Sequence, residues 1–145
     1  MEILNRKARY DYFVEDEIEA GMVLTGTEIK SIRLGKVNLG DSYAIIRNEE
    51  IYLLNTHISS YEKGNIFNHD ETRTRKLLMH KSQIKKLNNK VTLEGYTLIP
   101  LKIYFVKGRA KVLVGLCKGK KNFDKRETIK TRDVNREIAK NYKLR

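Results

Sequence analysis

The sequence contains little cysteine and proline and no tryptophan, and these shortages exclude several classes of protein. One cysteine among 145 residues allows neither an intramolecular disulfide nor a four-cysteine zinc site. One proline and nine glycines do not make a low-complexity chain. No apolar run approaches the roughly 18 residues of a membrane-spanning helix, and the N-terminus lacks the apolar core of a secretory signal. Length and absences together predict one soluble, cytoplasmic domain, with room for a tail.

Positive charge is what the sequence has in excess. Lys and Arg number 30 against 18 Asp and Glu, which gives a formal net charge of +12. Such a balance predicts a polyanionic partner, either RNA, DNA or an acidic membrane. Residues 118–145 carry eleven basic and four acidic side chains, more than half of the excess. We expect the packed body to end near Gly119, and the alternative is a final amphipathic helix packed on the body.

Alternating apolar residues predict that the body consists mainly of β-strands. The alternation over 99–105 and 112–116, on either side of Lys107-Gly108-Arg109, predicts a hairpin. Pro100 has no amide hydrogen to donate, so we expect it at a strand start, at an edge or at a bulge.

A second hairpin is predicted over 42–58, with its turn at Asn48-Glu49-Glu50. Further strands are expected over 10–14 and 22–24. These strands are short and lie close together in the sequence, which is typical of a small antiparallel barrel.

Two helices are predicted between the strands. One covers 27–34 and ends at Gly35, and the other covers 82–91 with Ser82 as its N-cap. The predicted fold class is therefore mainly β: an OB-like antiparallel β-barrel with peripheral short helices and a basic C-terminal tail. We assign residues 1–118 to the barrel and 119–145 to the tail.

Side chains that could support catalysis are few and scattered. His57, His69 and His80 could join Asp70 in a metal site, but their spacing matches no compact ligand motif. Cys117 lies in an apolar strand and is expected to pack there. An RNA-processing nuclease using His69, Asp70 and His80 stays open as an alternative, as does a generic OB-fold RNA binder. We expect no cofactor.

Basic clusters favour a nucleic-acid partner. They lie at 5–10, 73–76 and 118–126, beside aromatic or polar turn residues. Lys and Arg neutralise phosphates, and an exposed aromatic ring can stack on a base. RNA is favoured over DNA because no helix-turn-helix, zinc-finger or heptad pattern is present.

The sequence resembles the bacterial small protein B family over nearly its whole length. The matching segments, in order, are Asn5-Arg6-Lys7-Ala8-Arg9, Glu19-Ala20-Gly21, Leu24-Thr25-Gly26-Thr27-Glu28, Gly40-Asp41-Ser42-Tyr43, Asn68-His69-Asp70, Thr72-Arg73-Thr74-Arg75-Lys76-Leu77-Leu78, Gly115-Leu116, Lys118-Gly119-Lys120-Lys121 and Asp124-Lys125-Arg126.

This resemblance implies a non-catalytic adaptor of trans-translation. The family's barrel grips the tRNA-like domain of tmRNA, and the complex enters the empty A site of a stalled ribosome. The family's tail is disordered when free; it enters the mRNA channel beyond the small-subunit decoding centre and becomes helical there. Neither a membrane nor DNA is an expected partner.

The basic clusters and the resemblance together predict the site residues. Those expected to bind tmRNA are Asn5, Arg6, Lys7, Arg9, Glu19, Arg73, Arg75, Lys76, Leu78, His80, Lys118, Lys120 and Lys121. Those expected in the ribosome-binding tail are Phe123, Asp124, Lys125, Arg126, Arg132, Arg136, Ile138 and Lys140.

Two of these assignments depend on context. By its sequence alone, Leu78 belongs in the core; the resemblance places it on the RNA-binding surface instead. In the tail, Val134, Ile138 and Tyr142 recur every four residues, which predicts one side of a helix. A helix this short is marginal in water, and the resemblance implies that it forms on the ribosome.

Overall fold

The computed structural model describes residues 2–62 and 68–120 of the chain. The elements, in chain order, are β1 (Glu2–Leu4), α1 (Arg6–Asp11), β2 (Tyr12–Met22), α2 (Gly26–Arg33), β3 (Val37–Asn38), β4 (Tyr43–Arg47), β5 (Glu50–Leu54), β6 (His57–Ile58), β7 (Arg75–Leu78), α3 (Lys81–Glu94), β8 (Thr97–Val106) and β9 (Arg109–Gly119).

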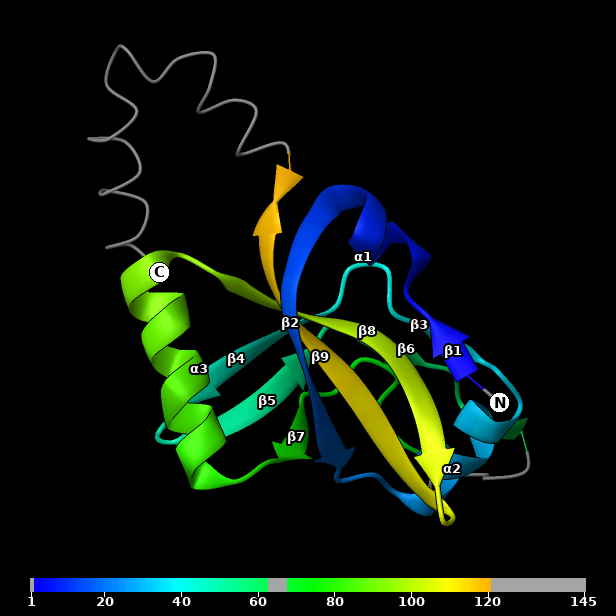
Figure 1. The fold of residues 1–145 in the computed structure, drawn as a ribbon. Coiled ribbons are helices and arrows are strands. Elements are labelled where there is room, and N and C mark those ends of the chain that lie inside the picture. Colours follow the sequence, from blue (N-terminus) through cyan, green and yellow to red (C-terminus); the bar gives the residue numbers. More distant parts are fainter. Residues whose placement is uncertain (1, 63–67, 121–145) are drawn as a thin grey trace.

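Antiparallel strands close into a barrel, which confirms the predicted fold class. The order β8-β4-β5-β7-β2-β9 returns to β8 through the β8–β9 pairing. The ring closes at the bridge between Ala44 and Leu98, and β1 adds to the other end of the same edge of β8. Figure 1 shows α3 beside β4 and β5, and α1 at the top of the view against β2 and β8.

The barrel interior is the main hydrophobic core. Inward-facing residues of every barrel strand are buried there, among them Ile51, Leu77, Val112 and Val114. Ile84 and Leu87 of α3 join this core. Because one face of each strand fills the interior, the alternate side chains point outward and are available for binding.

A second, smaller cluster lies outside the barrel wall, under α1. Ala8 of α1 packs there with Ile99, Leu101 and Cys117. Gly115 leaves room for the Leu101 side chain in this cluster, because a Cβ at position 115 would lie only 2.9 Å from it. Helix α1 is therefore fixed to the outer surface of β8 and β9.

Both predicted hairpins are present. Lys107 and Gly108 form the turn between β8 and β9, and Asn48 and Glu49 form the turn between β4 and β5, all four with positive φ. Such two-residue turns match the twist of paired strands. The β8–β9 register shifts between Pro100 and Lys102, which places Pro100 at a bulge, as expected.

The strands predicted over 10–14 and 22–24 are wrong in extent. Tyr10 and Asp11 belong to α1, and one long strand, β2, runs from Tyr12 to Met22. A register shift between Val14 and Asp16 breaks the alternation within it, so the sequence does not show one continuous strand.

The two predicted helices exist with small differences at their ends. Helix α2 begins after Thr25, whose side chain and Glu28 form a reciprocal capping box, and Gly35 follows its end at φ 77°. The N-cap of α3 is His80 rather than Ser82, and α3 extends to Glu94. None of the helices in residues 2–62 and 68–120 is long and apolar enough to cross a membrane.

Candidate RNA-binding surface

The outer side of β7, β2, β9 and β8 forms one continuous surface of exposed and half-buried residues, which we call the β2–β9 face. Leu78 pairs with Gly21, Gly21 with Lys111, and Lys111 with Tyr104. Leu78 is 54% exposed, whereas its neighbour Leu77 is buried in the core. Leu78 is therefore exposed, as a place on an RNA-binding surface requires, and its contact with RNA stays a prediction.

Glu19 lies on this same face, two residues before Gly21 on β2. Its carboxylate accepts a hydrogen bond of 2.6 Å from the Tyr104 hydroxyl. Partial burial and this bond raise the pKa of Tyr104 to about 12, so the phenol stays protonated. Glu19 is thus held in one orientation, with acceptor capacity left for a ligand.

The sequence reasoning missed Tyr104 and Lys111 on this face. The period-two alternation over 99–105 contained the signal, because Tyr104, between the buried Ile103 and the partly buried Phe105, must point to the other side of the strand. Lys111 precedes the buried Val112 in the same way.

Helix α1 presents the first basic cluster to solvent. Arg6, Lys7 and Arg9 are exposed, with Arg9 paired to Glu17 at 2.7 Å and Lys7 to Asp41 at 3.5 Å. Exposed pairs of this kind contribute little to stability. Their cations can therefore exchange a carboxylate for a phosphate at small cost.

Asn5 does not lie on the surface, so the prediction of a direct RNA contact is corrected. Only 6% of Asn5 is exposed. Its amide nitrogen donates to the carbonyls of Leu39 and Pro100, and its oxygen accepts from the backbone of Ala8. Asn5 therefore joins α1 to β8 and to the segment before β4.

Arg75 is also removed from the predicted contact set. Its side chain is fully buried and pairs with Glu28 at 2.6 Å, and it donates to the carbonyls of Thr56, Arg73, Asp70 and Glu71. A guanidinium that is enclosed in this way cannot reach a phosphate.

Arg73 is partly exposed and binds both oxygens of Glu28: it donates from Nη2 to Oε1 at 2.8 Å and from Nε to Oε2 at 2.9 Å. Burial alone would raise the pKa of Glu28, but hydrogen bonds from Arg73, Thr25 and Arg75 outweigh it and lower the pKa below its ordinary value. This Arg–Glu–Arg group joins α2 to the segment that enters β7.

Lys76 of the same cluster points outward from β7. It pairs with Glu50 at 2.8 Å, and Glu50 also accepts from the Tyr52 hydroxyl. Hydrogen bonding and charge attraction from Glu50 raise the pKa of Lys76. Lys76 is accessible, but RNA must compete with Glu50 for it.

The end of β9 holds two cations over aromatic rings. The Lys118 ammonium lies 4.6 Å from the centre of the Tyr96 ring, and that of Lys120 lies 5.1 Å from the centre of the Phe13 ring. Lys120 also donates to the Arg9 carbonyl. These contacts bring the third basic cluster next to the first, at the α1 end of the barrel.

The residues of the nuclease alternative do not come together as a catalytic group. His69 donates from Nε2 to the Ile58 carbonyl, which leaves Nδ1 of the neutral ring to accept from Thr27. His80 is exposed at the start of α3. Within residues 2–62 and 68–120, no group of three or more His, Cys, Asp and Glu side chains is placed to hold a metal ion.

Cys117 is fully buried, as expected for a packed residue. Burial raises the pKa of its thiol to about 11, so it is not a nucleophile at neutral pH. Predicted residues outside the described part of the chain are Lys121, Phe123, Asp124, Lys125, Arg126, Arg132, Arg136, Ile138 and Lys140.

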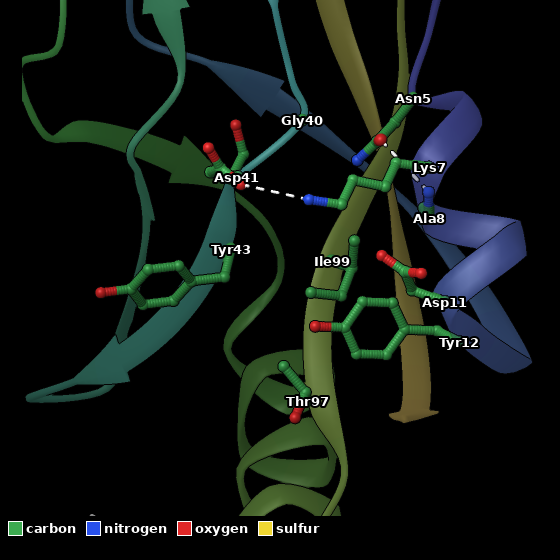
Figure 2. Close-up of a pocket in the computed structure, with 11 residues that line it drawn as sticks. Asn5, Lys7, Ala8, Asp11, Tyr12, Gly40, Asp41, Tyr43, Thr97 and Ile99 are labelled. Atoms are coloured by element: carbon green, nitrogen blue, oxygen red, sulfur yellow. Dashed lines mark hydrogen bonds and ion pairs between the residues drawn. The ribbon is translucent and has the colours of Figure 1, made fainter. Parts of the chain in front are cut away.

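A cleft of about 270 Å³ lies between α1 and the segment that enters β4. Figure 2 shows Asp11 and Tyr12 on one wall, Asp41 and Tyr43 on the other, and the Lys7–Asp41 ion pair across the top. Apart from Lys7, the sequence reasoning singled out none of these residues as ligand-binding. Gly40-Asp41-Ser42-Tyr43 was noticed only as a matching segment.

Comparisons with known proteins decide the family. The family model described as "SmpB protein" matches residues 2–144. The chain belongs to the SmpB family. A protein of Shouchella clausii named "SsrA-binding protein" is 58% identical over 97% of this chain and 90% of its own length. A protein of the same name from Enterococcus faecalis is 60% identical over 96% of this chain and 90% of its own length.

A solved structure supports the same conclusion for the fold. A chain described by the words "tmRNA-SmpB: a journey to the center of the bacterial ribosome" is 50% identical and superposes with a TM-score of 0.70. The match covers 82% of this chain and 84% of the solved one. The barrel is thus that of the SmpB family.

Proposed function

We propose that this SmpB-family protein binds tmRNA and delivers it to the A site of stalled ribosomes for trans-translation. The observation that carries the proposal is the match of nearly the whole chain to proteins named SsrA-binding protein, at 58–60% identity. The similar solved chain, described with tmRNA and the ribosome, supports both partners.

The β2–β9 face is the proposed contact for the tRNA-like domain. Folded RNA is recognised through shape, loops and 2′-hydroxyls rather than through the deep major groove. Glu19, oriented by Tyr104, can accept hydrogen bonds from a base edge or a 2′-hydroxyl. Leu78 offers an exposed apolar contact beside it, and Lys111 a cation for a neighbouring phosphate.

Phosphate binding is assigned to the cations that the structure places around α1 and the end of β9. Arg6, Lys7 and Arg9 of α1 are exposed, and Lys118 and Lys120 at the end of β9 are half-buried. Lys76 and His80 border the β2–β9 face and are assigned to its rim. Asn5, Arg73 and Arg75 act instead by holding α1 and β7 in place.

The tail is proposed to act on the ribosome rather than on tmRNA. Phe123 is assigned to stacking in the decoding centre, next to Lys121, Asp124, Lys125 and Arg126. Arg132, Arg136 and Lys140 would face phosphates of the mRNA channel, with Ile138 on the opposite side of a helix. The protein would be a cytoplasmic adaptor that catalyses no reaction.

A binding experiment tests the assignment to tmRNA. We expect the full chain to shift labelled tmRNA in a native gel at a concentration at which an excess of bulk tRNA does not compete. Equal competition by tRNA would instead indicate a generic OB-fold RNA binder. Cleavage of the RNA in the presence of a divalent metal ion would indicate the nuclease.

Two substitutions test the β2–β9 face. We expect Glu19→Gln to weaken tmRNA binding about 10-fold, because hydrogen bonds to charged groups are worth about 1.5–3 kcal/mol. Leu78→Ala should weaken it several-fold through lost apolar contact. The controls are Glu49→Gln, at the β4–β5 turn, and Leu93→Ala, which removes a leucine that is 79% exposed on α3. Equal effects of variants and controls would contradict the assignment.

A further inference from the structure

The cleft between α1 and residues 39–43 has a distinct composition from the basic surface around it. Two carboxylates, Asp11 and Asp41, line it together with a single lysine. A phosphate inside the cleft would be repelled by this pair, although the exposed Arg6 and Arg9 of the same helix attract an RNA backbone. The charge pattern thus fits a nucleotide whose base, not its phosphate, enters the cleft.

The floor and walls of the cleft suit a flat, partly apolar ring. Ala8 and Ile99 belong to the outer apolar cluster, and the rings of Tyr12 and Tyr43 pack against it. The volume of about 270 Å³ lies just below the range typical of drug-sized ligands. It is therefore suited to a single base.

The polar groups of one wall specify which base fits. Figure 2 shows the Asp11 carboxylate beside the Tyr12 ring, whose hydroxyl points toward the space between the walls. Within the described part of the chain, neither group has a hydrogen-bond partner. Burial and the charge of Asp11 raise the pKa of Tyr12, so its hydroxyl stays available as a donor.

We propose that this cleft binds one unstacked guanine base of an RNA. The Asp11 carboxylate accepts the N1–H and N2–H donors of the base, and the Tyr12 hydroxyl donates to its O6. Adenine presents an acceptor where guanine has N1–H, so it cannot satisfy Asp11 in the same way. The ligand class rests on the proposed function, because it assumes that the partner is RNA.

Lys7 and Asn5 have supporting roles in this site. The Lys7–Asp41 pair spans the cleft at 3.5 Å, with the two side chains 59% and 85% exposed. Such a pair is weak, and Lys7 can turn to the phosphate of the bound nucleotide. Asn5 positions both walls, since it bonds to Leu39, to Pro100 and to the start of α1.

The test is a titration of the ¹⁵N-labelled full chain with GMP, in which binding is measured by the changes in the amide chemical shifts. We expect saturable shifts confined to residues 7–12 and 40–43, and binding at least about 10-fold weaker for AMP, UMP and ribose 5-phosphate. Equal shifts with ribose 5-phosphate would show a phosphate site and overturn the proposal. Shifts of the same amides by Mg²⁺ alone, with no response to GMP, would also overturn it.

Matched variants sharpen the result. Asp11→Asn should weaken GMP binding about 10-fold, and Tyr12→Phe several-fold. Glu49→Gln removes the same charge from the far end of β4 and should leave GMP binding unchanged. The loss of negative charge in Asp11→Asn would by itself strengthen GMP binding, because removing a carboxylate increases the general attraction to the phosphate. Weaker binding by Asp11→Asn therefore cannot come from net charge.

The tmRNA gel shift separates the two hypotheses. If tmRNA is preferred over tRNA but GMP does not bind in the cleft, the guanine site is wrong and the proposed function stands. If GMP binds while tmRNA and tRNA compete equally, the proposed function fails and the base site remains.

Discussion

Glu28 is the carboxylate that neutralises Arg75, a fully buried arginine. It is fully buried and accepts hydrogen bonds from Arg73, Arg75 and the Thr25 backbone. Arg75 has no other carboxylate partner within the described residues. Its charge is tolerated in the interior because Glu28 neutralises it and four backbone carbonyls accept its remaining hydrogens.

We expect Glu28→Gln to lower the free energy of unfolding by about 3–5 kcal/mol at pH 7, because it leaves the Arg75 charge buried without a counterion. Urea denaturation followed by circular dichroism measures the change. The control is Glu50→Gln, which breaks the exposed pair with Lys76 and should leave the midpoint close to that of the parent. Equal losses in both variants would contradict this account.

The same carboxyl gives the protein a defined acid sensitivity. The pKa of Glu28 is lowered in the folded state from its ordinary 4.5, so the folded protein binds this proton less tightly than the unfolded chain. The stabilisation is complete above the unfolded pKa and is lost as the pH falls through the lower, folded value. Between pH 5 and pH 3 the parent should therefore lose more stability than Glu28→Gln.

Cys117 provides a chemical probe of opening beneath α1. Its thiol is fully buried, with a pKa raised to about 11, and thiolate is the reactive form. We expect no reaction with a thiol-specific disulfide reagent at pH 8 in the native protein and full reaction in denaturing urea. Immediate, complete reaction of the native protein would show that α1 does not protect β9.

At the scale of elements, the strands and helices with a regular apolar period were predicted, and those without one were not. The β8–β9 hairpin and helices α2 and α3 follow from alternation or from a three-to-four-residue spacing. Helix α1 has only six residues and no apolar stripe, and it exists because Asn5 caps it and Ala8 packs on the barrel. In β2, the bulge near Asp16 interrupts the alternation.

The candidate site was predictable to the extent that it consists of exposed charges. Arg6, Lys7 and Arg9 are exposed on α1, as the cluster of basic residues in the sequence predicted. Arg75 has the same sequence character, but it is buried because Glu28, 47 residues away, meets it across the fold. A local sequence pattern cannot predict a partner so far away in the chain. For the same reason it cannot predict the cleft that forms where Asn5 holds α1 against residues 39–43.

The β4–β5 turn contains a correctable strain. Asn48 and Glu49 have φ of 53° and 65°, a conformation that disfavours most L-residues and for which Asn-Gly is the preferred pair. We expect Glu49→Gly to raise the free energy of unfolding by roughly 0.5–1 kcal/mol. Thermal unfolding measures the change. The comparison is Gly108→Ala in the β8–β9 turn, which puts a side chain at a φ of 79° and should lower the melting temperature. A lower melting temperature for Glu49→Gly would contradict the assignment of strain.

At the scale of the whole molecule, charge is divided between the folded body and the residues that follow it. Strand β9 ends at Gly119, and within residues 2–62 and 68–120 every core residue of the barrel precedes this point. A chain ending at Gly119 should therefore keep the barrel and the β2–β9 face. It loses most of the segment whose eleven basic and four acidic residues hold the larger part of the net charge.

Salt dependence of binding distinguishes what the two parts contact. For Z phosphates neutralised, the logarithm of the binding constant falls against the logarithm of salt with a slope of roughly −0.7Z to −0.9Z. If the tail acts on the ribosome, the full chain and the chain ending at Gly119 should show the same slope on isolated tmRNA. On stalled ribosomes, the full chain should show the steeper slope, because its additional cations meet ribosomal phosphates there. Filter binding between about 50 and 200 mM salt measures both. A slope on isolated tmRNA that becomes shallower by several units on truncation would assign the tail to tmRNA instead.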